Sequence, residues 1–500
     1  MWRIVENVGE SVDLPVRCEI VAADDSWRSH SYPCRCTRIV RKKPVAPNDH
    51  FRHNPVAMDD QLRLVIRSKL GEAIREPFPT FTRREASAPP LRNKARAVIG
   101  MRRAGKTTFL HQCLADRLAK GVERERLVYF NFEDERLGEL AAADLGLILD
   151  EYYRAFPKYR RSKQVTWCFD EIQTIPGWEK FIRRVMDAEN VEILLSGSSA
   201  KMLSREVATT MRGRALETII TPFNFREFVR ARGATLPTER QLMSPRDESG
   251  WLAHFDDYVL TGGFPEACQE ELATSRVELL QGYVETVLFR DVAERHGVAN
   301  LVALRAFVRQ LLRQPAASLS ITKVHADFRS RGIGVAKETL MAFLTHLEDA
   351  FLVFTLPIAS HSERRQQVNP RKVYVSDHAL AAAFQPTADG NRGHHLENIV
   401  ACELQRRCAA LAYVKTASGL EVDFLATALD GSQQLVQVAA DLRGTGTLER
   451  ELRALAAAGE EFPKARKLLL AETAVARGAT IPTDVESQSI WRWLLDWLVQ

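Results

Sequence analysis

Residues 97–108 read AVIGMRRAGKTT, and this stretch constrains the fold of the chain more than any other. It predicts a short apolar strand, then a loop bounded by Gly100 and Gly105, then a helix from Lys106 to about residue 120. The loop fits the pattern G-x-x-x-x-G-K-[ST] of the phosphate-binding P-loop. The alternative is a chance match in a glycine-bearing turn, but the strand and the amphipathic helix around the loop argue against it. The stretch predicts an α/β fold with a parallel sheet.

The P-loop predicts a site for ATP and Mg²⁺. Its two glycines allow backbone conformations and close approaches that a β-carbon would hinder. The loop amides then face the β-phosphate at a helix N-terminus, which favours anions. We expect Lys106 to reach the β- and γ-phosphates and the Thr107 hydroxyl to bind Mg²⁺. The residues expected to bind the nucleotide are Gly100, Met101, Arg102, Arg103, Ala104, Gly105, Lys106, Thr107 and Thr108.

A second stretch, residues 165–171, is an apolar run that ends in two carboxylates, Asp170 and Glu171. If its strand lies beside the P-loop strand, Asp170 comes close to Mg²⁺ and holds it through water. Glu171 would then polarise the attacking water. The alternative is a buried strand followed by an acidic helix cap, for which one acid would suffice. The adjacent pair favours an ATPase.

Strands and helices alternate from residue 97 to residue 220, which predicts a parallel sheet covered on both faces. Ligands of such sheets bind at the carboxyl ends of the strands. That edge is expected to collect Lys106, Glu133, Asp170 and Ser198. Ser198 would hydrogen-bond the γ-phosphate or the attacking water. The alternative for Ser198 is a turn and a helix cap, where serine is also favoured.

Three arginines follow this sheet: Arg205, Arg212 and Arg214. Any one of them could act as an arginine finger on the ATP of a neighbouring subunit. The alternative is that they are solvated charges on a helix. A finger acting on a neighbour would require the chain to form a homo-oligomer.

The charge of the chain is concentrated near its start. The net charge is +5, and residues 1–96 hold 18 Lys/Arg and 12 Asp/Glu, a balance of +6, which leaves −1 for the rest. The basic balance is therefore a property of the N-terminal segment and is not evidence that the folded body binds nucleic acid. We find no apolar run of membrane-spanning length and no signal-peptide pattern, and eight cysteines are too few for a disulfide scaffold. A cytoplasmic protein with no membrane partner is expected.

The pattern beyond the sheet predicts a helical lid, then a winged helix, then a mixed α/β domain. In the winged helix, Lys323, Arg329, Arg331 and Lys337 could touch DNA phosphates. The alternative is a structural or protein-docking winged helix. A start at Met58, with residues 1–57 absent from the native protein, is an open alternative to a poorly ordered segment. The predicted parts are 1–57 poorly ordered, 58–96 lead-in helix and linker, 97–220 P-loop core, 221–299 lid, 300–357 winged helix and 358–500 C-terminal domain.

These motifs together resemble a prokaryotic branch of AAA-type ATPases that carry a C-terminal domain of unknown function. The resemblance covers roughly residues 60–475 and implies ATP binding, hydrolysis and a nuclease-like C-terminal fold. It implies no substrate. The stretches that carry it are 100–108, 131–136, 169–173, 177–180, 197–201, 203–208, 262–266, 288–292, 369–374 and 419–424.

The C-terminal order of elements is similar to the PD-(D/E)xK nuclease fold. Glu397 on a helix and Asp423 on a strand would be its acids, and residues 437–439 would occupy the last motif. Active members hold Mg²⁺ with the acids and use a lysine beside the water. Here Ala439 stands at the lysine position and Gln437 is neutral, so we expect no cleavage of nucleic acid. Lys415 is a candidate for a relocated lysine, with a solvated strand-end charge as the alternative.

The sequence therefore favours an ATP-hydrolysing switch or motor whose C-terminal part recognises a partner, either a protein or a nucleic acid. One alternative is an ATP-dependent DNA-processing factor or nuclease, against which Ala439 argues. A further alternative is a nucleotide-gated binding protein with negligible turnover. Lys106, Thr107, Asp170 and Glu171 favour turnover.

Overall fold

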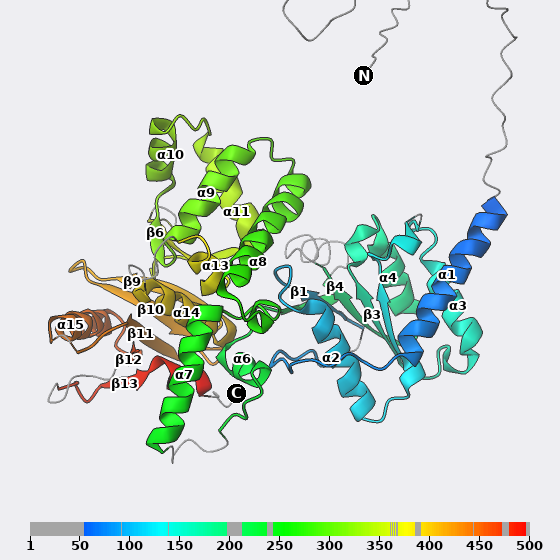
Figure 1. Cartoon of the computed structure of the whole chain (residues 1–500), viewed down its shortest axis with the longest axis horizontal. Coiled ribbons are helices and arrows are strands. Elements are labelled where there is room, and N and C mark those ends of the chain that lie inside the picture. The colour runs from blue at the N-terminus through cyan, green and yellow to red at the C-terminus, as the bar shows by residue number, and fades with distance from the viewer. Residues whose placement is uncertain are drawn as a thin grey trace, which may run out of the picture. The chain divides into compact units, whose positions relative to one another are not determined.

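The computed structural model describes residues 55–91, 93–138, 140–197, 213–237, 244–360, 362, 364, 366, 369–385, 392–443, 445–472 and 480–496 (Figure 1). The expectation of a poorly ordered start falls almost entirely on residues 1–54, which lie outside this range. Ser198, Arg205 and Arg212 also lie outside the described residues.

A five-stranded parallel sheet forms the first half of the described chain, in the order β2-β3-β4-β1-β5. All six residues of β3 are buried, as expected for a strand covered on both faces. The predicted α/β fold with a parallel sheet is confirmed. The strands are β1 (Ala95–Ile99), β2 (Leu127–Asn131), β3 (Val165–Asp170), β4 (Val191–Ser196) and β5 (Ala215–Ile219).

Helices cover both faces of this sheet (Figure 1). On one face, Trp167 and Phe169 of β3 join an apolar core with side chains of α1, α3 and α4. On the other face, Cys168 packs with Phe109 and Leu110 of α2. The predicted lead-in helix corresponds to α1, which packs on β2 and α3. The helices are α1 (Pro55–Arg75), α2 (Lys106–Ala119), α3 (Gly146–Ala155) and α4 (Trp178–Ala188).

Helices follow the sheet, beginning at Asn224, whose side chain and that of Glu227 form a reciprocal cap for α6. This cap satisfies amides that the first turn of a helix leaves without partners. Further on, η6 is a π-helix, a form often found at functional positions. The elements are α6 (Phe225–Ala231), α7 (Pro245–Thr261), η5 (Ala267–Gln269), α8 (Ala273–Thr286) and η6 (Val287–Glu294).

A small antiparallel sheet, in the order β6-β8-β7, accompanies the next three helices. The sequence placed the end of this part at residue 357 and assigned the strand near residue 372 to the C-terminal domain. Instead, β8 pairs with both β6 and β7. The strand near residue 372 was assigned to the wrong sheet because the local sequence pattern does not show which strand another strand pairs with. The elements are α9 (Leu301–Arg313), β6 (Ala317–Leu319), α10 (Ile321–Ser330), α11 (Lys337–Asp349), β7 (Val353–Leu356) and β8 (Arg371–Val375).

A second five-stranded sheet, in the order β13-β12-β11-β10-β9, forms the C-terminal part. β9 to β11 pair antiparallel, and β11 to β13 pair parallel. One apolar core joins this sheet to α14 and α16, and another joins it to α15. The sequence did not predict β13. The elements are α13 (His378–Ala382), α14 (Arg392–Arg407), β9 (Ala410–Lys415), β10 (Glu421–Thr427), β11 (Gln433–Ala439), α15 (Thr445–Glu461), β12 (Arg466–Ala471), β13 (Val485–Ser489) and α16 (Ile490–Leu495).

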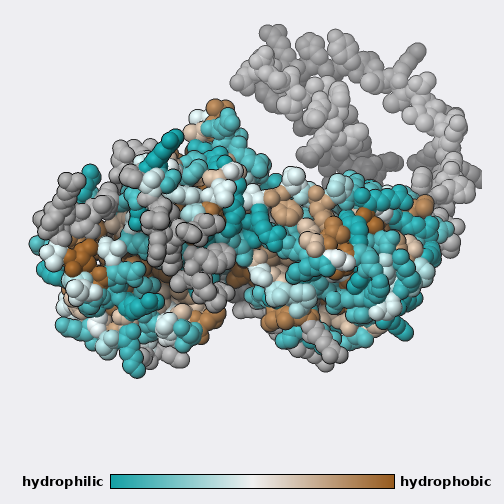
Figure 2. Space-filling view, turned by 90° about the horizontal axis from the view of Figure 1, so that it is seen from below, coloured by the Kyte–Doolittle hydropathy of each residue, from teal (hydrophilic) through white to brown (hydrophobic). Residues whose placement is uncertain are grey.

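Among the described residues, no helix is both long enough and apolar enough to cross a bilayer. In the view of Figure 2, hydrophilic residues cover most of the visible face, and apolar residues lie in separate patches.

Arg226 of α6 joins distant segments of the chain. Its guanidinium lies 2.6 Å from a carboxylate oxygen of Glu85 and 3.6 Å from one of Glu403, and it donates to the carbonyl oxygen of Leu494 at 2.9 Å. All three charged side chains are at most 11% exposed. A buried charge left without its partner is costly, so this ion pair network ties the segment before β1 to α6, α14 and α16.

We predict that Arg226→Ala lowers the free energy of unfolding by about 1.5–3 kcal/mol, because it removes charge-assisted hydrogen bonds to two buried carboxylates. These carboxylates keep other cations, Arg230 beside Glu85 and Arg406 and Arg407 beside Glu403. Thermal and urea unfolding will measure the loss. Arg232→Ala is the matched control, since Arg232 pairs with the more exposed Asp257 and should cost about 0–1 kcal/mol. Equal losses in the two variants would contradict the assignment.

Candidate functional site

The backbone of residues 100–105 takes a shape that depends on its two glycines. Gly105 caps α2 in the left-handed region, with a φ of 96°. At Gly100, φ is 147°, and a β-carbon there would lie 2.0 Å from the carbonyl oxygen of Ile220. Any other residue at position 100 would therefore have to displace the backbone after β5. The loop ends at the N-terminus of α2, whose free amides favour an anion.

The Lys106 ammonium lies inside this loop. Its Nζ donates to the carbonyl oxygens of Gly100 and Met101, both at 3.1 Å. Burial lowers the pKa of Lys106, while the charges of Glu171 and Asp170 act in the opposite direction. The ammonium is therefore held where incoming phosphate oxygens could replace two neutral carbonyls as its acceptors.

Asp170, at the end of β3, accepts hydrogen bonds from three elements. Thr107 Oγ1 and the Tyr129 hydroxyl donate to its Oδ2, at 2.7 and 2.6 Å. The Ser196 hydroxyl, at the end of β4, donates to its Oδ1. The two residues predicted to hold Mg²⁺, Thr107 and Asp170, are thus in direct contact. A hydroxyl and a carboxylate oxygen are hard ligands and fit Mg²⁺.

Glu171 follows β3 in a strained position, with a left-handed φ of 55°. Its amide donates to Ser196 Oγ at 3.1 Å, and the Gln173 amide group donates to its carboxylate. Burial raises the pKa of Glu171. Lys106 opposes the rise, and the charges of Asp170 and Glu133 add to it. A carboxylate with a raised pKa is a better acceptor for a proton of water.

The edge predicted from the sequence forms in part. Lys106, Asp170 and Glu171 influence one another electrostatically, and Glu133 lies near enough to affect Glu171. The position of Ser198 is outside the described residues. Sequence reasoning missed Tyr129 and Ser196, both of which bind Asp170. A serine directly after the apolar run Ile193–Leu195 was the signal for Ser196.

The variable residues of the P-loop contact the second half of the chain. Arg102 Nε lies 2.9 Å from Asp291 Oδ2 of η6, and Asp291 is 1% exposed. The Ser376 hydroxyl, after β8, lies 3.3 Å from Met101 Sδ. The pKa of Arg102 is raised by Asp291, Glu171 and Glu133 against the effect of burial. Arg102 therefore connects the acids at the sheet edge with η6. The sequence did not predict this connection.

Arg103 and Ala104 make weaker or purely backbone contacts. Arg103 lies 3.7 Å from Glu266 and is largely exposed. The carbonyl oxygen of Ala104 accepts from Arg84 Nη1 at 2.8 Å. Arg84 belongs to the segment before β1, so that segment supports the loop from one side.

Arg214 lies away from the P-loop of its own chain. It immediately precedes β5, and its carbonyl oxygen accepts from the Ala95 amide at the start of β1. The P-loop follows the other end of β1. The Arg214 side chain pairs with Asp187 at 2.5 Å. A role in its own ATP site is therefore excluded by position, and the predicted action on a neighbouring subunit remains a prediction.

The C-terminal residues suggested by the nuclease resemblance also come together. Glu397 on α14 and Asp423 on β10 contact one ammonium group, that of Lys372 on β8. Gln437 on β11 accepts from the Asp423 amide at 3.3 Å. Lys415, the lysine considered from the sequence, is exposed at the end of β9. Lys372 was missed, and its only sequence signal was a lysine directly before the apolar residues 373–375.

Comparison with known proteins finds two families along the chain. Residues 92–229 match the model of an AAA domain, and residues 252–390 match a domain of unknown function. The uncharacterized protein MJ1544 of Methanocaldococcus jannaschii is 32% identical over 366 residues, which cover 72% of this chain and 78% of that protein. An uncharacterized protein of Haemophilus influenzae is 26% identical over 336 residues, covering 67% and 80%.

Solved structures were compared as well. The AMPPCP-bound DnaA of Aquifex aeolicus is 15% identical, with a TM-score of 0.22, and covers 57% of this chain and 86% of its own. The Drosophila ORC bound to AT-rich DNA and Cdc6 is 10% identical, with a TM-score of 0.19, covering 66% and 93%.

Proposed function

Because the chain belongs to the family of AAA-domain proteins that includes MJ1544 of Methanocaldococcus jannaschii, we propose that it hydrolyses ATP and uses the cycle as a switch or motor. The observation that carries the proposal is the convergence of Lys106, Thr107, Asp170 and Glu171 at one edge of the sheet. Phosphoryl transfer depends mainly on positioning and charge stabilisation, and these four side chains supply both.

Each side chain has a distinct role in the proposed reaction. Lys106 exchanges its carbonyl partners for phosphate oxygens and stabilises their negative charge. Thr107 and Asp170 would hold Mg²⁺, which supplies charge neutralisation on the phosphates. Glu171 orients a water molecule and accepts its proton. Ser196 keeps the two carboxylates in place, since its oxygen contacts both Asp170 and the Glu171 amide.

The contacts of the P-loop support a switch whose C-terminal part recognises a partner. Arg102 belongs to the phosphate-binding loop, and its guanidinium pairs with Asp291 of η6. A guanidinium that turns to a triphosphate weakens its bond to Asp291, so η6 senses whether the site is filled. The partner is a protein or a nucleic acid.

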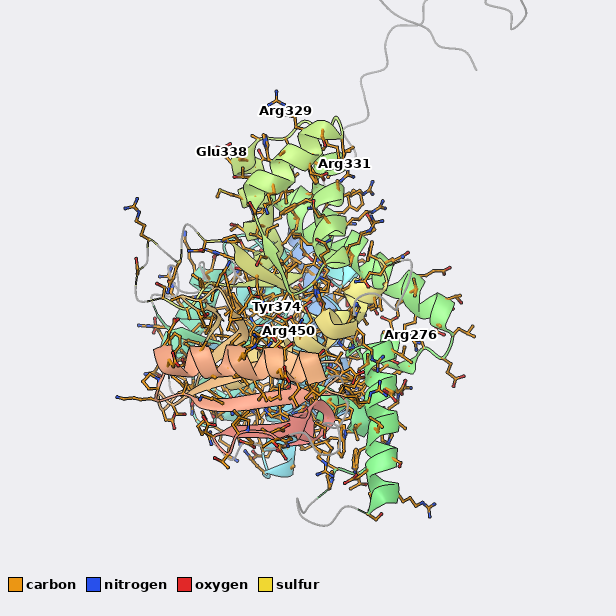
Figure 3. The ribbon with its side chains drawn as sticks, turned by 90° about the vertical axis from the view of Figure 1, so that its left-hand side faces the viewer. Arg276, Arg329, Arg331, Glu338, Tyr374 and Arg450 are labelled. Atoms are coloured by element: carbon orange, nitrogen blue, oxygen red, sulfur yellow. The ribbon has the colours of Figure 1, made fainter. Side chains whose placement is uncertain are left out.

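One observation favours a second candidate, an ATP-dependent factor that acts on DNA. Lys323, Arg329, Arg331 and Lys337 are all exposed on α10, α11 and the turn between them. Figure 3 shows Arg329, Arg331 and Glu338 at the outer end of these helices. Cations there would contact phosphates, but Glu338 and Asp327 reduce the local positive charge. Salt-dependent binding of duplex DNA, lost when both arginines are changed, would favour this candidate.

We predict that Lys106→Ala abolishes ATP binding, because it removes the cation facing the phosphates. Glu171→Gln should keep ATP binding and slow hydrolysis by about 10²–10⁴-fold, since an amide cannot accept a proton. Fluorescent-nucleotide binding and phosphate release will measure the two effects. Lys120→Ala, at the exposed end of α2, is the control for Lys106. Normal hydrolysis by Glu171→Gln would refute its role in polarising water.

We predict that ATP changes amide hydrogen exchange in residues 287–294, because Arg102 leaves Asp291 for the triphosphate. Arg102→Ala should still bind ATP through Lys106 and the loop amides, but lose this change in exchange. Arg290→Ala is the control, since Arg290 lies on η6 and pairs with Glu294 on the same helix. If the response to ATP persists in Arg102→Ala, the coupling does not run through this ion pair.

We predict that one arginine among Arg205, Arg212 and Arg214 completes the site of a neighbouring subunit. Its alanine variant should bind ATP normally and hydrolyse it slowly. Mixing that variant with Glu171→Gln protein should restore part of the activity, because each supplies what the other lacks. Steady-state ATPase assays at varied mixing ratios will test this. A strictly monomeric protein with full turnover contradicts it.

A further inference from the structure

Three carboxylates converge on one lysine in the C-terminal part of the chain. Lys372 Nζ lies 2.8 Å from Glu421 Oε1, 3.0 Å from Glu397 Oε1 and 3.3 Å from Asp423 Oδ1. The lysine comes from β8, and the acids come from α14 and β10. The Lys372 side chain is 5% exposed, so the ammonium is enclosed by its partners.

Neighbouring groups fix two of these carboxylates. The Tyr374 hydroxyl donates to Glu397 Oε1 at 2.8 Å, and the Val438 amide donates to Asp423 Oδ2 at 3.0 Å. Beyond Asp423, Gln437 donates to Glu451 at 2.8 Å, and Glu451 pairs with Arg450. Figure 3 labels Tyr374 on β8 and Arg450 on α15. Glu397 and Asp423 are therefore held in place and are not free to rearrange around a new ligand, whereas the Glu421 side chain is 40% exposed.

Carboxylate oxygens directed at one point are the usual ligands of a divalent cation in proteins. In this chain the ammonium group of Lys372 occupies that position. It carries a single charge and lies at hydrogen-bond distance from the carboxylate oxygens. Mg²⁺ requires oxygens at about 2.0–2.1 Å in octahedral geometry. A cation could enter only if Lys372 moved out, and its side chain is buried between two sheets.

We propose that Lys372 takes, with its own ammonium group, the place among Glu397, Glu421 and Asp423 that a divalent cation would need. The C-terminal part is then a domain with the acids of a metal site and an internal cation in place of the metal. The lysine also joins β8 of the small sheet to α14 and β10, and the C-terminal part does not cut nucleic acid. Ala439 means only that the catalytic lysine is missing from its usual position. Lys372, in contrast, occupies the position that the metal ion would need.

The proposal is distinct from a relocated catalytic lysine. A catalytic lysine must leave the carboxylates enough free oxygens to bind the metal beside it. Here the same Nζ contacts all three acids, and the second oxygen of Asp423 accepts from the backbone. The two possibilities differ in one measurable property, which is whether the wild-type chain binds Mn²⁺ at these acids.

The test is the response of thermal stability to Mn²⁺ without nucleotide. We expect Lys372→Ala to unfold at a lower temperature than the wild type and to regain several degrees when Mn²⁺ is added. The double variant Lys372→Ala/Asp423→Asn should not respond. Wild type and Lys415→Ala, the control with an exposed lysine removed, should respond equally and weakly. Any Mn²⁺ effect at the P-loop is common to all four proteins.

Three results would overturn the proposal. The first is Mn²⁺ binding by the wild type that Asp423→Asn abolishes. The second is cleavage of single- or double-stranded DNA, with Mg²⁺ or Mn²⁺ and with or without ATP, that is lost in Asp423→Ala. The third is a Lys372→Ala variant that gains nothing from Mn²⁺. If this variant folds only when produced with Mn²⁺, the proposal is supported, and if it folds in neither condition, the proposal fails.

Discussion

The hydrogen bonds to Asp170 are the interaction on which the AAA domain of the structure depends. A carboxylate at the end of a fully buried strand needs donors, and Asp170 receives them from Thr107, Tyr129 and Ser196. These donors come from α2, β2 and β4, so one side chain of β3 connects the P-loop helix with two neighbouring strands. The loop, the lysine and the second acid derive their positions from that arrangement.

The same edge of the sheet is also where the two halves of the chain meet. Loop residues that the motif leaves variable, Met101 and Arg102, contact Ser376 and Asp291. Residues with no required role in binding phosphate are thus used to connect the loop to the helices that follow. A π-helix at the receiving end suits this purpose, because its irregular hydrogen bonding costs stability and persists where function uses it.

Two buried lysines, Lys106 and Lys372, have different kinds of partner. At the P-loop, the hydrogen bonds of Lys106 to described residues all go to backbone carbonyls, so the lysine can accept stronger anionic partners. In the C-terminal part, Lys372 already faces three carboxylates, which raise its pKa against the effect of burial. The first lysine is available for a ligand, and the second is fully engaged. Comparable burial therefore leads to different chemistry because the partners differ.

The sequence by itself determined the parallel sheet, the P-loop and the two acids after β3, because each depends on a local pattern of glycines, apolar runs and charges. It also placed Glu397 and Asp423 on the correct kinds of element. Only the tertiary structure decided which distant side chains complete these sites. Ser196 and Tyr129 reach Asp170, β8 joins a sheet with β6 and β7, and Lys372 reaches the C-terminal acids through contacts between segments far apart in the chain. Periodicity and motif spacing carry no information about such contacts, since they are fixed by how the elements pack.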